Sequence, residues 1–198
     1  MNLRATFDPL TDILVAQTSK PEGLKPLNFR TLNPFQRALM VIDGTVTKFI
    51  EAYMMEPIDI VRISQEEQRL EESHEWLEAP AGTLAISREV LLRGKYSHRI
   101  YAYAISILAY DRLSSSVKKG LEVDGGGLGR ILRSDKLETY REIMWYGRER
   151  FKELPEHIRE LTHDDFLSRT YRILVGGRPI MVINEKFPCG LEDVPAHH

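Results

Sequence analysis

The sequence predicts an α+β protein in which helices precede an antiparallel sheet. Apolar residues follow helical spacing up to about residue 55 and alternate with period two after residue 57. Two alternating segments flank Gly176-Gly177, which is typical of a β-hairpin. The 198 residues suffice for one domain with a substantial core. We therefore expect one domain over residues 1–198, in which residues 1–32 are an N-terminal helical extension.

Three helices are expected in the first part of the chain. Asp8-Pro9 offers a capping residue and a proline in the first turn, and Asn33-Pro34 repeats this signal. Apolar residues follow both starts at helical spacing. Asp43-Gly44-Thr45 ends the second helix and caps a third over residues 46–55.

Strands are expected in the remainder of the chain. The segment over residues 136–150 is ambiguous, and we favour a strand with a helical turn at one end. Residues 111–134 are expected to form short helices interrupted by Gly125-Gly126-Gly127. The expected strands cover residues 58–64, 83–93, 99–109, 136–150, 166–175 and 179–187.

Composition argues against several classes of protein. The net charge of −2 and pI near 6.3 lack the basic excess of a nucleic-acid binder. One cysteine and unsuitably spaced histidines predict neither a disulfide nor a metal site. The longest apolar run, residues 100–110, is about half of a membrane span, and the start resembles no secretory signal. We therefore expect a cytoplasmic protein without a membrane, nucleic-acid or metal partner. Nothing in the sequence indicates an oligomeric state.

Arg88 breaks the alternation of its strand. It shares one face with four apolar residues, namely Leu84, Ile86, Val90 and Leu92. A buried guanidinium costs several kcal/mol unless it is paired. An anionic group is therefore expected to meet Arg88.

Glu185 repeats the anomaly with the opposite charge. It shares a face with Met181, Ile183 and Phe187 in the last strand. A carboxyl group surrounded by apolar side chains is a candidate hydrogen-bond donor or acid–base group. Two other interpretations remain open: Arg88 and Glu185 pair with each other as a structural ion pair, or Arg88 lies at a strand edge in water.

Two further segments could present backbone N–H groups to an anion. One is Gly125-Gly126-Gly127-Leu128-Gly129-Arg130, and the other is Thr45-Val46-Thr47 at a helix start. A dinucleotide site is not expected, because no convincing strand precedes the glycines. The alternative for the glycines is a flexible turn before a helix.

The chain resembles the chorismate pyruvate-lyases, most closely the branch outside the ubiquinone pathway of proteobacteria. The resemblance runs from about Phe35 to Pro188 and rests on short motifs in family order. These are Asp43-Gly44-Thr45-Val46-Thr47, Arg88-Glu89-Val90-Leu91-Leu92, Gly127-Leu128-Gly129-Arg130, Gly177-Arg178-Pro179-Ile180 and Asn184-Glu185-Lys186-Phe187-Pro188.

This resemblance implies a single six-stranded antiparallel sheet with helical flaps over a buried ligand pocket. It implies conversion of chorismate, or a related cyclic diacid, to 4-hydroxybenzoate and pyruvate without a cofactor. Arg88 would bind the ring carboxylate, and Glu185 would meet the hydroxyl end as the second catalytic residue. The substrate-binding residues would be Thr45, Val46, Leu128, Gly129 and Arg130.

Some features of the resemblance leave alternatives open. The proteobacterial enzymes have Thr-Pro where this chain has Gly126-Gly127. Arg130, Arg169 and Arg172 are all candidates for the second carboxylate of chorismate. The same fold occurs in non-catalytic effector-binding domains of transcription regulators. Residues 1–32 are too short for the DNA-binding domain of such regulators, which favours the enzyme.

Overall fold

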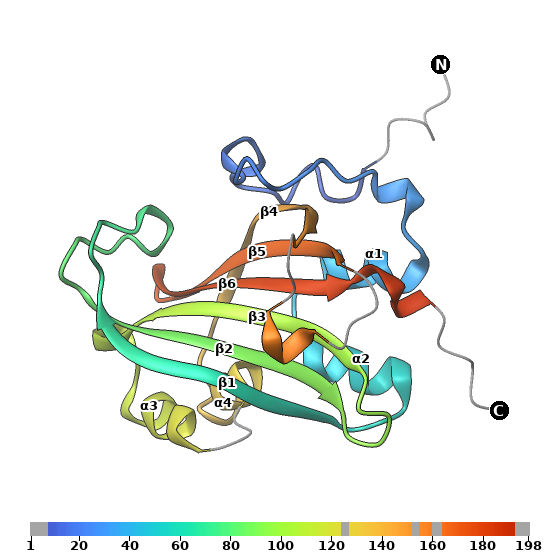
Figure 1. The fold of residues 1–198 in the computed structure, drawn as a ribbon. Helices are drawn as coiled ribbons and strands as arrows, with labels where there is room; N and C mark the ends of the chain where they lie inside the picture. The colour runs from blue at the N-terminus through green and yellow to red at the C-terminus, as the bar shows by residue number, and fades with distance from the viewer. Residues whose placement is uncertain (1–7, 124–126, 152–154, 160–163, 193–198) are drawn as a thin grey trace.

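The computed structural model describes residues 8–123, 127–151, 155–159 and 164–192. Its centre is a six-stranded antiparallel sheet in the order β1-β2-β3-β6-β5-β4 (Figure 1). The strands are β1 (Ile58–Arg69), β2 (Leu84–Gly94), β3 (Ile100–Ala109), β4 (Tyr140–Arg150), β5 (Asp165–Val175) and β6 (Arg178–Pro188). The predicted α+β class and the single six-stranded antiparallel sheet are confirmed.

The ambiguous segment before residue 151 is a strand. β4 pairs with β5 over its length, with a bulge between Ile143 and Trp145. β1 is longer than expected, since its polar end pairs with β2 as far as Arg69 and Leu84. The period-two pattern missed this extension because its residues are polar on both faces.

Four α-helices form within the described residues. They are α1 (Pro34–Val41), α2 (Val46–Met54), α3 (Ser115–Glu122) and α4 (Leu128–Ser134). α1 starts with a capping box, because the Asn33 side chain accepts from Gln36 N at 2.8 Å and the Gln36 side chain accepts from Asn33 N at 3.1 Å. Short 3₁₀ segments are η2 (Gln17–Ser19), η3 (Phe29–Thr31), η4 (Glu75–Leu77), η5 (Tyr110–Arg112), η6 (Glu156–Ile158) and η7 (Cys189–Glu192).

The helix predicted after Asp8-Pro9 is wrong. Residues 8–33 contain η2 and η3 but no α-helix. Val15 N donates to Ile143 O at 2.9 Å, and Ala16 N donates to Met144 O at 3.0 Å. β4 is an edge strand, and its free backbone groups bind this segment, which therefore follows the edge through turns and isolated bridges at Leu14 and Lys25 instead of forming an α-helix.

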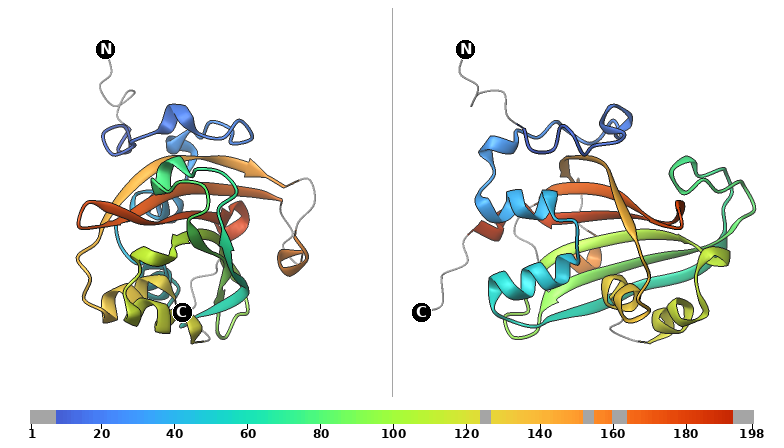
Figure 2. Two further views of the ribbon diagram at one scale, coloured as in Figure 1. Left: turned by 90° about the vertical axis from the view of Figure 1, so that its left-hand side faces the viewer. Right: turned by 180° about the vertical axis from the view of Figure 1, so that it is seen from behind.

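The sheet is strongly twisted, and β4 runs steeply across the direction of β1, β2 and β3 (Figures 1 and 2). Two apolar clusters form against the sheet. One joins α1 and α2 to it through residues such as Leu39 and Ile50. The other joins α3 and α4 to it through Val117 and Leu132. Both clusters include residues of β2, β3 and β6, so the helices meet the same curved sheet at neighbouring places.

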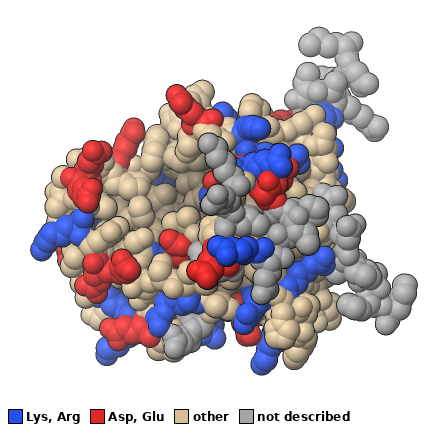
Figure 3. All heavy atoms as spheres, in the orientation of Figure 1, with Lys and Arg blue, Asp and Glu red and all other residues tan. Residues whose placement is uncertain are grey.

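On the face drawn in Figure 3, basic and acidic side chains are interspersed and form no single basic patch. No helix in the described part of the chain has the length and apolar character needed to cross a membrane.

Candidate active site

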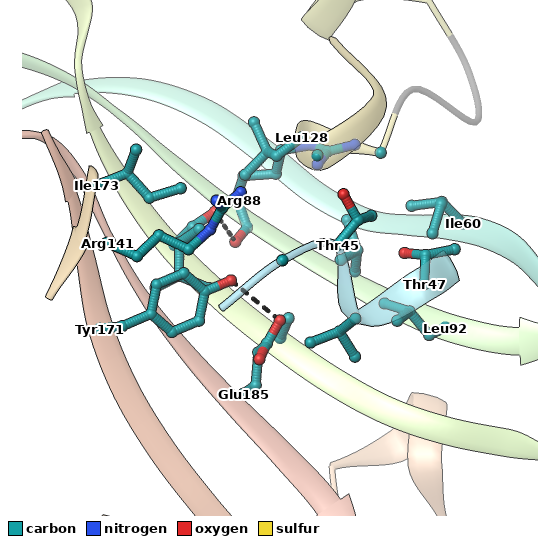
Figure 4. Close-up of a pocket in the computed structure, with 18 residues that line it drawn as sticks. Thr45, Thr47, Ile60, Arg88, Leu92, Leu128, Arg141, Tyr171, Ile173 and Glu185 are labelled. Carbon is teal, nitrogen blue, oxygen red and sulfur yellow. Dashed lines mark hydrogen bonds between the residues drawn. The ribbon is translucent and has the colours of Figure 1, made fainter. Parts of the chain in front are cut away.

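A cavity lies between the curved sheet and the starts of α2 and α4 (Figure 4). Its floor is apolar and includes Val90, Ala104 and Ile183. Three charged side chains enter it from different strands: Arg88 from β2, Arg141 from β4 and Glu185 from β6. The enclosed volume is about 60 Å³. Small-molecule sites usually offer roughly 300 Å³ or more, so a ring-sized ligand requires the surrounding groups to shift.

Two chain segments, residues 44–47 and 127–129, cover the cavity, and we call them the roof segments. They include four of the predicted substrate-binding residues, namely Thr45, Val46, Leu128 and Gly129. A Cβ atom at Gly129 would lie 2.7 Å from Thr45 Cγ2 and 2.9 Å from its hydroxyl oxygen. Glycine at this position therefore lets the roof segments touch. Gly125 and Gly126 of the predicted glycine motif lie outside the described residues.

Arg88 is buried, with only 2% of its surface exposed. It pairs across the ladder with Ser106, whose hydroxyl donates to the Arg88 carbonyl at 3.3 Å. Burial and, to a smaller extent, the nearby charge of Arg62 lower the pKa of Arg88 to about 10. The guanidinium is therefore still cationic at neutral pH. Because Arg88 is buried and β2 lies between β1 and β3, the interpretation of Arg88 as a strand-edge residue in water is wrong.

Glu185 is held by β5 (Figure 4). Arg169 Nε donates to Glu185 Oε2 at 2.9 Å, and the Tyr171 hydroxyl donates to Glu185 Oε1 at 3.1 Å. Arg169 also donates to the carbonyl of Ile42 at 3.1 Å. One alternative left open by the sequence was an ion pair between Glu185 and Arg88, but the arginine that binds Glu185 at 2.9 Å is Arg169. The register explains this, because Arg169 is directly opposite Glu185.

Tyr171 was missed by the sequence analysis. Burial raises the pKa of its hydroxyl, and the negative charge of Glu185 raises it further. The phenol is therefore protonated at neutral pH and acts as a donor to the carboxylate. Its position on the same face as Arg169 and Ile173 follows from the period of two, so alternation along β5 could have placed it.

Arg88 and Glu185 stand at two ends of the cavity. β3 separates their strands: Arg88 is opposite Ser106, and Glu185 is opposite Ala104. With strands about 4.8 Å apart and a rise of about 3.4 Å per residue, their backbones are separated by about 12 Å. The two side chains can therefore address opposite ends of one small ligand.

The other predicted residues lie elsewhere. Arg130 is exposed and borders a surface depression with Ser116 and Asp135, because α4 turns this side chain away from the cavity. Arg172 is on the opposite face of the sheet and binds Glu142 at 2.6 Å. We therefore omit Arg130 and Arg172 from the site.

Arg141 was also missed. Arg141 and Tyr171 line both the cavity and an adjoining surface cleft of about 240 Å³, which we call the outer cleft. The outer cleft is bordered by the exposed side chains of Ile13, Val15 and Tyr140. The two residues thus form the wall between the cavity and the outer cleft.

Over the described ranges, no group of three or more histidine, cysteine or acidic residues has the arrangement of a metal site. The polar groups of the cavity are instead suited to an anion with a hydrogen-bonding end.

Solved structures share the fold at low sequence identity. PhnF from Mycobacterium smegmatis is 12% identical with a TM-score of 0.56, covering 85% of this chain and 68% of that one. The effector domain of PhnF is 13% identical with a TM-score of 0.55, covering 83% and 91%. These similarities concern the fold alone.

Curated relatives are nearer in sequence. A chorismate pyruvate-lyase of Mycobacterium tuberculosis is 26% identical over 174 residues, covering 83% of this chain and 84% of the relative. That of Mycobacterium leprae is 26% identical over 164 residues, covering 80% and 76%. The model of the Rv2949c-like chorismate pyruvate-lyases matches residues 40–194, which contain both roof segments together with Arg88 and Glu185. The chain therefore belongs to the Rv2949c-like chorismate pyruvate-lyase family.

Proposed function

We propose that this protein converts chorismate to 4-hydroxybenzoate and pyruvate without a cofactor. The observation that carries the proposal is the cavity itself. In a chain of this family, the buried Arg88 guanidinium and the Glu185 carboxylate enter one cavity from two ends. That arrangement suits a ring with a carboxylate at one end and a hydroxyl group at the other.

Arg88 binds the ring carboxylate in this proposal. A guanidinium offers paired N–H donors that match the two oxygens of a carboxylate. The low polarity of the surrounding apolar side chains strengthens this interaction. The first turns of α2 and α4 add backbone N–H groups at Val46 and Leu128, since the first N–H groups of a helix lack intrahelical partners.

Glu185 acts at the other end. The C4–H bond of chorismate breaks and its proton goes to the carboxylate. The electron pair of that bond forms a ring double bond, and the C3–O bond to the enolpyruvyl group breaks. Enolpyruvate leaves with the C–O electron pair and takes up a proton at its terminal carbon to become pyruvate. The aromatic product ring supplies the driving force.

Arg169 and Tyr171 orient the catalytic carboxylate. Each oxygen of Glu185 accepts one hydrogen bond from these residues and keeps further acceptor capacity for the ligand. Because the neighbouring strand fixes both donors, the carboxylate is held in place before substrate binds.

The roof segments must part to admit substrate and close again over it. The cavity volume of about 60 Å³ is too small for a ring with two substituents. Closure then excludes water and strengthens the contacts of Arg88 and Glu185.

The test is to incubate the purified protein with chorismate, without added metal or cofactor, and to separate the products by chromatography. The proposal predicts 4-hydroxybenzoate and pyruvate in equal amounts. Unchanged chorismate would contradict it.

The alternative is a non-catalytic effector-binding domain, and the observation that favours it is the fold likeness to the effector domain of PhnF. This alternative predicts that a small acid binds in the cavity and no product forms. Binding of 4-hydroxybenzoate with unchanged chorismate would therefore select it.

A further inference from the structure

Arg141 is a second positively charged group in the cavity, and it enters from the side opposite β2. It is the second residue of β4, which crosses over the sheet near α4 (Figure 2). Its side chain reaches from β4 toward the same space as Arg88 (Figure 4). The side chain is 17% exposed, so most of it is removed from water.

The polar atoms of Arg141 are poorly satisfied within the described part of the protein. Its Nε is buried and has no hydrogen-bond partner there. Its Nη1 lies 4.0 Å from an oxygen of Asp43, whose side chain is 70% exposed. An ion pair this long and this exposed to water stabilises the protein little. A buried donor left unsatisfied is costly, and it points to a ligand that supplies the missing acceptor.

The lining of the cavity gives the class of that ligand. Two guanidiniums, those of Arg88 and Arg141, line the cavity together with one carboxylate, that of Glu185. Arg169 binds the Glu185 carboxylate at 2.9 Å. Two guanidiniums that enter one cavity from different strands suit a ligand with two acidic groups, because each guanidinium can bind one carboxylate.

We propose that Arg141 binds the second carboxylate of a dianionic ring substrate, which is the enolpyruvyl carboxylate if the proposed function holds. The geometry agrees with the chemistry of that substrate. Its ether carbon is next to the hydroxyl-bearing carbon, and Arg141 lies close enough to Tyr171 for its charge to act on the phenol that contacts Glu185. Arg141 thereby distinguishes the dianionic substrate from the monoanionic aromatic product, which lacks this carboxylate.

The experiment compares a dianionic and a monoanionic ligand. In Arg141→Gln, the KM for chorismate should rise about 30-fold or more, as expected when one partner of a desolvated charge pair is removed. The Kd for 4-hydroxybenzoate, measured by calorimetry, should stay within about threefold of wild type. Arg141→Lys retains the charge and should recover part of the loss. Arg148→Gln removes an exposed arginine of the same strand and is the matched control.

If wild type turns over chorismate normally, two results would reject the assignment of Arg141 and leave the proposed function intact. Equal weakening of both ligands would place Arg141 at the ring carboxylate or in a structural role, and unchanged values for both would remove it from the site. Where wild type binds chorismate without turnover, its Kd replaces the KM and the same criteria apply. If wild type neither binds nor converts chorismate, the proposed function fails and the assignment fails with it.

Discussion

The two faces of the sheet use buried charges in different ways. On the face opposite the cavity, each of three strongly polar side chains binds a carboxylate of the same chain at 2.6 Å. These pairs are Tyr103–Glu89, Arg172–Glu142 and Lys186–Glu149. On the cavity face, one carboxylate is already compensated and two further arginines face the enclosed space.

The difference teaches that burial alone does not identify a ligand site. Lys186 is 7% exposed and Arg88 is 2% exposed, so both are nearly removed from water. The face opposite the cavity pairs its buried polar groups with carboxylates of the same chain, whereas the cavity face directs Arg88 and Arg141 toward a space that a ligand can occupy. Variants on the two faces should therefore separate effects on turnover from effects on stability.

The two largest effects on turnover are expected for variants of the cavity residues, and the first of these variants is Arg88→Met. Removal of a desolvated partner of a substrate carboxylate costs about 2–5 kcal/mol, so kcat/KM should fall by roughly 30- to 1,000-fold or more. The Tm should be unchanged or higher, because burial already disfavours the charged guanidinium and lowers its pKa to about 10. Steady-state kinetics and thermal denaturation measure the two effects. A lowered Tm with normal turnover would place Arg88 among the structural charges.

The second of these variants is Glu185→Gln. The amide keeps the shape of the side chain but cannot accept the ring proton, so kcat should fall by about 10²- to 10⁴-fold. The Kd for 4-hydroxybenzoate should change much less. Tyr171→Phe is the companion variant, since it removes only the donor to Oε1, and it should lower kcat less than Glu185→Gln. Retained turnover in Glu185→Gln would exclude the acid–base role.

Arg172→Met tests the opposite face. It leaves Glu142 without the guanidinium that binds it at 2.6 Å, which should lower the free energy of unfolding by about 1–3 kcal/mol. Turnover at a temperature where the variant is folded should match wild type. A loss of turnover without a loss of stability would contradict the separation of the two faces.

Gly129→Ala tests the contact between the roof segments. Its new Cβ would meet Thr45 Cγ2 at 2.7 Å, so α4 or the start of α2 must move. We expect kcat/KM to fall by about tenfold, as small misplacements of positioning groups cost up to about 10²-fold. The Tm should change little, since the contact lies at the edge of the core. The control is Gly23→Ala, because its new Cβ would lie in open space. Gly82→Ala is unsuitable as a control because Gly82 has a φ of 82°, which strains an alanine.

The smallest effect concerns pH and a site remote from the cavity. Burial alone would raise the pKa of Glu56, but hydrogen bonds from Tyr101 and Ser97 outweigh burial and lower it to about 2. In the unfolded chain the pKa of a glutamate is about 4.3. The stabilisation that these hydrogen bonds give to the folded state is therefore present above about pH 4.3 and is lost as the pH falls toward 2. The Tm difference between wild type and Glu56→Gln should therefore shrink between pH 5 and pH 2.5. A constant difference would contradict this linkage.

Much of the fold could be predicted because local patterns dictate it. Alternation identified the strands, Gly176-Gly177 marked the last hairpin, and Asn33-Pro34 marked α1. The N-terminal segment could not be predicted this way, because Val15 and Ala16 bind backbone groups of β4, far away in the sequence.

The part of the site that follows from the alternation of side chains along the strands could be predicted from the sequence. Alternation placed Arg88 and Glu185 on apolar faces, and both side chains line the cavity. It could not reveal that Arg169 holds Glu185, since that depends on the register of β5 against β6. Arg141 was missed because only the steep crossing of β4 brings the start of this strand over the cavity.

The most direct test of the difference between the two faces is a crystal structure of the protein grown with 4-hydroxybenzoate. We predict the ligand carboxylate within about 2.7–3.2 Å of the Arg88 guanidinium nitrogens, with its hydroxyl group directed to Glu185. Arg141 should make no contact with this monoanion. A ligand bound in the outer cleft, or on the opposite face near Lys186, would contradict the account.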